Sequence, residues 1–159
     1  MQHQRRTEEC APRQMPQKTI VNGTDRSSCA VSVLIADDHE PWRSMVRSFL
    51  ERERQWQVFE ACDGLEAVRK AAELHPDVVL LDVGMPGLNG IEAAQKIREV
   101  SPDSEIIFLS QQVDEEIVSA ALRTGASAYV LKDKIANRPS ACYSSFLAVH
   151  SVGGSLRTN

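Results

Sequence analysis

Acidic, hydroxyl and amine side chains follow apolar runs in four separate parts of the chain. The residues are Asp37 and Asp38 after residues 31–36, Asp82 after 78–81, Ser110 after 105–109 and Lys132 after 128–131. Three carboxylates that converge repel one another, so they need either protonation or a divalent cation. Carboxylate and carbonyl oxygens with water suit Mg²⁺, and a lysine adds a second positive charge. Such a site suits a phosphoryl group, with Asp82, the most central carboxylate, as the nucleophile that forms an aspartyl phosphate.

The spacing of apolar residues predicts the elements that bring these groups together. Short apolar runs predict strands, of which 78–81 is buried on both faces, and periodic stretches between them predict helices. Five strands alternate with helices across short connections, which predicts a parallel sheet covered on both faces. We therefore expect an α/β, flavodoxin-like, doubly wound (βα)5 fold of three layers with strand order 2-1-3-4-5. In that order the four strands that carry the candidate groups are neighbours and end at one edge.

Helices are expected to turn specific apolar residues inward. The expected inward residues are Met45, Val46, Phe49 and Leu50 in the first helix, Leu65, Val68, Ala71 and Ala72 in the second, Ile91, Ala94 and Ile97 in the third, and Ile117, Val118, Ala121 and Leu122 in the fourth.

Composition limits the classes of partner and compartment. The chain has 159 residues, 42% hydrophobic and 25% charged, which fits one soluble globular domain. The net charge of −4 gives no general attraction to nucleic acid or to an anionic membrane, so neither partner is expected. No signal peptide or spanning segment is visible, and the four dispersed cysteines form no CxxC pair. A reduced, cytoplasmic protein is expected.

Each candidate residue also has a plain structural explanation. Acids such as Asp37 and Asp38 are favoured at a helix start, and a lysine at a strand end is usually only solvated. Ser110 could simply cap a turn, and Tyr129 could pack its ring in the core with the hydroxyl at the surface. The joint placement of the three acids and the lysine favours the metal and phosphate site.

Three motifs resemble the receiver domain of bacterial response regulators, the CheY-like proteins of two-component systems. They are residues 34–40 (LIADDHE), residues 80–90 (LLDVGMPGLNG) with Ser110, and residues 125–132 (GASAYVLK). The resemblance covers roughly residues 31–134, with all motifs in the family's order. It implies a phosphorelay phosphoprotein that signals by conformational change and is not an enzyme.

The resemblance also implies a role for each matching position. Asp82 would accept a phosphoryl group from a sensor histidine kinase or phosphotransfer protein. Asp37, Asp38, Asp82 and the carbonyl of Gly84 would hold Mg²⁺. Lys132 would pair with a phosphoryl oxygen, and Ser110 and Tyr129 would form the switch that alters contacts with a downstream protein.

Two features depart from the family pattern. Gln111 follows the switch hydroxyl, where the family usually has a small residue. From Lys134 to Asn159 there is no Asp or Glu, and Pro139 and Gly153-Gly154 interrupt any late helix. We expect a disordered extension over 1–28, a receiver domain over 29–134, and an atypical tail over 135–159 in place of a regular fifth helix. An uncovered sheet face there would allow a homodimer.

Two other functions fit parts of the pattern. A pseudo-receiver would keep the fold and act by protein contact without phosphorylation, which Gln111 and the tail favour. A Mg²⁺-dependent phosphatase would usually place an acid two residues after the nucleophile, where this chain has Gly84.

Overall fold

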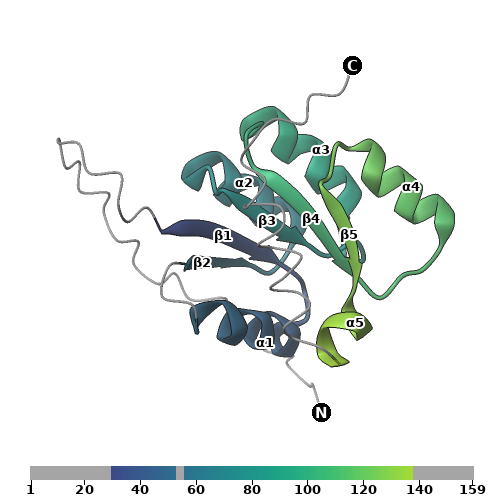
Figure 1. The fold of residues 1–159 in the computed structure, drawn as a ribbon. Helices are drawn as coiled ribbons and strands as arrows, with labels where there is room; N and C mark the ends of the chain where they lie inside the picture. Colours follow the sequence, from purple (N-terminus) through teal and green to yellow (C-terminus); the bar gives the residue numbers. More distant parts are fainter. Residues whose placement is uncertain (1–29, 53–55, 138–159) are drawn as a thin grey trace, which may run out of the picture.

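A parallel sheet in the order β2-β1-β3-β4-β5 forms the centre of the computed structural model, which describes residues 30–52 and 56–137 (Figure 1). The strands are β1 (Val31–Ala36), β2 (Trp56–Ala61), β3 (Val78–Leu81), β4 (Glu105–Ser110) and β5 (Ala128–Leu131). The helices are α1 (Glu40–Glu51), α2 (Gly64–Leu74), α3 (Gly90–Val100), α4 (Glu115–Arg123) and α5 (Lys132–Asn137). The predicted fold class and strand order are confirmed.

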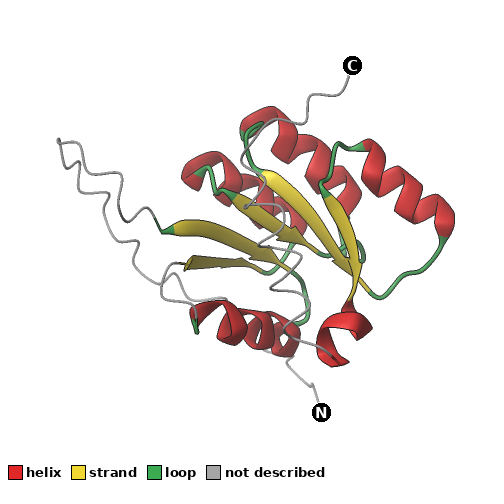
Figure 2. Ribbon diagram, viewed as in Figure 1, coloured by secondary structure: helices red, strands yellow, loops and turns green. Residues whose placement is uncertain are grey.

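Helices cover both faces of the sheet, as Figure 2 shows. Alternate strand residues such as Leu34, Leu81 and Phe108 pack with α2, α3 and α4, while Ile35 and Leu80 pack on the other face with α1 and α5. All four residues of β3 are at most 1% exposed, as expected for a central parallel strand. The strand that precedes Asp82 is thus fixed from both sides.

Local capping sets where three helices begin. The side chain of Asp63 accepts a hydrogen bond from the Glu66 N–H at the start of α2, and Asp114 caps α4 in the same way. Asn89 and Glu92 form a reciprocal capping box at the start of α3. These caps fix the helix starts that follow β2, β3 and β4, on the side of the sheet where the candidate site lies.

Three of the residues expected to face inward lie outside, namely Leu65, Ala72 and Leu122. Leu65 is 68% exposed and Leu122 is 45% exposed. In α2 the buried residues are the small Gly64, Ala67 and Ala71, because this helix approaches α3 and the sheet closely. A Cβ on Gly64 would collide with the backbone of Leu88, so the start of α2 leaves no room for a large inward side chain.

A fifth helix begins directly at Lys132. α5 spans Lys132–Asn137, and its Ile135 is 2% exposed against the cluster that α1 also covers. The expected domain boundary at residue 134 therefore falls inside this helix, and the packed fold extends past it. The predicted extension over 1–28 and most of the predicted tail lie outside the described residues. In the part that is described, no helix combines the length and the apolar character needed to cross a membrane.

Candidate functional site

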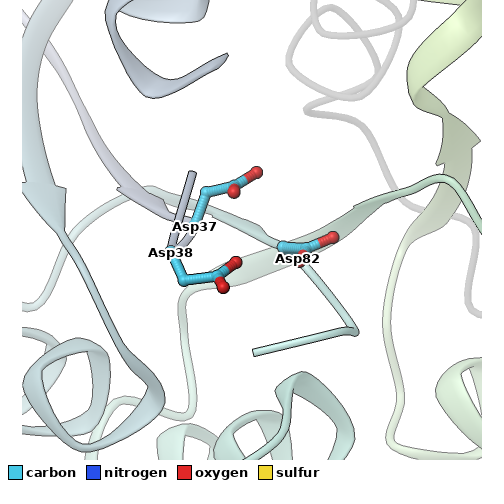
Figure 3. A group of neighbouring side chains, drawn as sticks. All are labelled: Asp37, Asp38 and Asp82. Atoms are coloured by element: carbon cyan, nitrogen blue, oxygen red, sulfur yellow. The ribbon is translucent and has the colours of Figure 1, made fainter. Parts of the chain in front are cut away.

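Asp37, Asp38 and Asp82 lie together at the carboxyl edge of the sheet. One carboxylate oxygen from each lies within 4.8 Å of the others. Asp37 and Asp38 follow β1, Asp82 follows the neighbouring β3, and Figure 3 shows the three side chains beside one another. The Asp82 N–H donates to the carbonyl of Ala36 at 2.9 Å, which holds the two strand ends in register. The predicted convergence of the three acids is therefore present in the structure.

Lys132 reaches the same pocket from the end of β5. Its Nζ lies 2.5 Å from Asp37 Oδ2 and 3.2 Å from Asp82 Oδ1. The lysine is 6% exposed, so this amine is a buried cation inside the acidic cluster and not a solvated strand end.

The charge balance around Asp82 remains unfavourable for its ionised form. Burial is the largest cause that raises the pKa of Asp82, and the charges of Asp37 and Asp38 raise it further. Lys132 lowers it, but the net shift is upward. One lysine thus leaves negative charge in the pocket that a cation can neutralise.

Gly84 lies next to the Asp82 side chain. A Cβ built on Gly84 would stand 3.6 Å from Asp82 Oδ2 and 3.7 Å from Gln112 Nε2. The backbone of the residue predicted to supply a carbonyl ligand therefore borders the acidic pocket. The donor set of three clustered carboxylates and a nearby backbone carbonyl fits a hard divalent cation such as Mg²⁺.

The two predicted switch residues meet at Gln112. Ser110 is 1% exposed, and its Oγ accepts a hydrogen bond from the Gln112 N–H at 3.1 Å. The hydroxyl of the half-buried Tyr129 donates to the Gln112 carbonyl at 2.9 Å, and its ring lies 6.1 Å from that of Phe108. In this structure Ser110 therefore caps the turn after β4, and Tyr129 both packs and binds the same turn.

Two residues of α1 complete the site without having been singled out for it from sequence. Arg43 is 8% exposed, and its guanidinium donates from Nη1 to the Asp37 carbonyl at 2.7 Å. Trp42 lies with its ring centroid 5.3 Å from Lys132 Nζ. A basic residue one turn into a helix that starts beside an acidic strand end was the available signal for Arg43.

The acidic pocket and its buried lysine lie at the carboxyl edge of a doubly wound sheet, which is where α/β proteins of this class bind their ligands. Residues 33–138 match the Response regulator receiver domain family, and the chain belongs to this family. Members of the family are signalling domains of two-component systems.

Named relatives and solved structures agree with this assignment. The chain is 43% identical over 103 residues to transcriptional regulatory protein LiaR of Bacillus subtilis, which covers 64% of this chain and 49% of LiaR. The receiver domain of the putative response regulator NarL from Mycobacterium tuberculosis has a TM-score of 0.62 and 35% identity, covering 65% of this chain and 84% of that one. The isolated REC domain of RcsB from Salmonella enterica, solved with the phosphomimetic BeF3−, has a TM-score of 0.60 and 30% identity, covering 65% and 78%.

The chain spans about half the length of the curated relatives it matches. LiaR is named a transcriptional regulatory protein, so the comparisons do not support the expectation that nucleic acid is absent among the partners. The net charge is a sum over the whole sequence. It therefore does not exclude nucleic acid as a partner of the longer relatives, which have further residues outside the matched region.

Proposed function

We propose that Asp82 is the phosphoacceptor of this receiver domain and that a histidine kinase or phosphotransfer protein supplies the phosphoryl group. The observation that carries the proposal is the position of Asp82, buried between two further carboxylates and 3.2 Å from the Lys132 amine. An aspartyl phosphate carries roughly two negative charges where the free carboxylate carries one, and this pocket accepts the added charge only with added positive charge.

Asp82 attacks phosphorus in this scheme. The bond from an Asp82 oxygen to phosphorus forms as the bond from phosphorus to the donor's histidine nitrogen breaks, and the imidazole leaves with the electron pair. Asp37, Asp38, Asp82 and the Gly84 carbonyl are the groups that would hold Mg²⁺. A bound Mg²⁺ supplies the positive charge that offsets the carboxylates and the incoming phosphoryl oxygens.

Lys132 and Ser110 bind the phosphoryl group of phosphorylated Asp82 in this proposal. The Lys132 amine exchanges its ion pair with the Asp82 carboxylate for one with a phosphoryl oxygen on the same residue. The Ser110 hydroxyl turns to another phosphoryl oxygen, and the turn that holds Gln112 and Tyr129 follows. The output is a shift between two populations of the protein that changes contacts with a downstream partner.

Mass spectrometry after treatment with acetyl phosphate tests the proposal. We expect the intact protein to gain one phosphoryl group in the presence of Mg²⁺, and the gain to disappear with EDTA and in Asp82→Asn. Asp103→Asn, at an exposed turn before β4, is the matched control and should be labelled like the wild type. Labelling that persists in Asp82→Asn would place the acceptor elsewhere, and a wild type that is never labelled would favour a pseudo-receiver.

A further inference from the structure

The Lys132 amine has an aromatic neighbour on the side of α1. Trp42 stands in the first turn of that helix, and its ring centroid lies 5.3 Å from Lys132 Nζ, with the ammonium over the ring face. The face of an indole ring attracts a cation, most strongly where water is excluded. Lys132 is 6% exposed and Trp42 is half-buried, so the contact is partly shielded from water.

Trp42 is held by packing rather than by a polar anchor. Its ring packs against the apolar cluster that includes Val33, Ile35 and Val46. Its Nε1 is buried and has no hydrogen-bond partner among the described residues. The contacts that orient the ring are therefore the apolar cluster and the ammonium.

The two carboxylates alone do not fix the position of the Lys132 amine. Nζ lies closer to Asp37, at 2.5 Å, than to Asp82, at 3.2 Å. A lysine has a flexible four-carbon stem and could follow Asp37 away from the phosphoacceptor. A fixed aromatic face on a rigid helix limits that freedom and keeps the amine within reach of both carboxylates.

We propose that Trp42 is a positioning residue that holds the Lys132 ammonium where it can meet the phosphoryl group on Asp82. The functional part of this inference rests on the proposed phosphorylation of Asp82. The contact itself does not, and it can be measured in the protein without any phosphodonor.

The variants Trp42→Phe and Trp42→Leu separate cation binding from packing. Phenylalanine keeps an aromatic face, whereas leucine keeps only apolar bulk. We expect the rate of labelling by acetyl phosphate to fall roughly 5- to 30-fold in Trp42→Leu and to stay within about threefold of wild type in Trp42→Phe. Trp56, the other tryptophan, packs in the same cluster from the start of β2, so Trp56→Leu is the matched control and should retain the wild-type rate.

A spectroscopic readout tests the contact independently. The indole ring current should shift the ε-methylene protons of Lys132 upfield in the NMR spectrum, with the signal assigned by its absence in Lys132→Ala. This shift should vanish in Trp42→Leu and persist in part in Trp42→Phe. Ordinary ε-methylene shifts in the wild type would overturn the inference, even if a leucine variant failed to fold.

The two readouts distinguish the failure of each proposal. Equal labelling rates in wild type and in folded Trp42→Leu would overturn the positioning role while leaving Asp82 as acceptor. An unlabelled wild type with upfield Lys132 protons would reject the phosphoacceptor proposal and support the contact.

Discussion

Replacing Asp82 by asparagine should stabilise the protein in the absence of metal. At an effective dielectric constant of about 20, two like unit charges 4.8 Å apart repel by roughly 3.5 kcal/mol, and Asp82 has two such neighbours within that distance. At the same dielectric constant, Lys132, 3.2 Å from Asp82, contributes roughly 5 kcal/mol of attraction. The repulsions exceed the attraction by roughly 2 kcal/mol, and the cost of burying the charge acts in the same direction.

Asparagine removes these costs but leaves the lysine with a weaker partner. We therefore expect a net gain of about 1 to 2 kcal/mol in the free energy of unfolding. In a domain of this size each kcal/mol raises Tm by about 4 to 8 °C. Urea unfolding of wild type and Asp82→Asn with EDTA at neutral pH measures the gain, and Asp103→Asn, on an exposed turn, should change stability by less than about 0.5 kcal/mol.

The pH dependence of that gain follows from the raised pKa of Asp82, whose ordinary value is 3.8. The folded protein binds the Asp82 proton more tightly than the unfolded chain does. The penalty of ionised Asp82 is therefore complete above its folded-state pKa and disappears as the pH falls towards 3.8. The gap between the two proteins should close over that range.

Adding Mg²⁺ should reverse the difference in stability between the wild type and Asp82→Asn. Mg²⁺ at 100 times its Kd should stabilise the wild type by about 2.7 kcal/mol and Asp82→Asn by much less. A variant that is less stable than the wild type without metal, or a gap that does not depend on pH, would refute the charge balance derived above.

Two further predictions concern the frame around the site. Burial raises the pKa of Glu66, but hydrogen bonds from Cys62 and Lys70 outweigh it and hold that pKa at about 2. Glu66→Gln should therefore lower the free energy of unfolding by roughly 1 to 3 kcal/mol at neutral pH. In urea unfolding this loss should shrink below pH 4.5, as the pH falls towards 2. A loss that does not change with pH would contradict the prediction. A Cβ on Gly90 would collide with the carbonyl of the proposed phosphoacceptor, whereas Gly87, at φ +75°, has open space around it. Gly90→Ala should cost more than about 3 kcal/mol and Gly87→Ala about 1 to 2 kcal/mol by the same assay, and equal costs would show that the backbone relaxes.

The order of elements and the edge where the site lies were predictable because both depend on local patterns. The fully apolar run before Asp82 indicates a strand buried on two faces, and short Gly- and Pro-rich connections indicate helices that return across the sheet. In a parallel sheet this ordering alone brings Asp37, Asp82 and Lys132 to one edge.

Side-chain burial was less predictable because it depends on how closely two elements approach. A helical period identifies a face but not the width of the surface that a neighbour covers. Leu65 and Leu122 lie at the margins of their helices' apolar faces and are exposed, while Ala67 is fully buried. Arg43, a charged residue, is buried because its guanidinium finds the Asp37 carbonyl and Glu60, which is 3.7 Å away on β2. Neither partner can be identified from spacing along the chain.

The link between site and surface also depends on a contact that the sequence does not reveal. Ser110 and Tyr129 are 19 positions apart, yet both hold the backbone of Gln112, one at its N–H and the other at its carbonyl. A phosphoryl group on Asp82 that attracted the Ser110 hydroxyl would remove the acceptor of the Gln112 N–H. Gln112 is exposed, so its N–H would then pair with water or a new partner, and the turn would lose the hydrogen bond that ties it to Ser110. A turn released in this way would also change the position of the carbonyl that Tyr129 binds, and we expect a change of charge at Asp82 to reach Tyr129 on β5 through this one residue.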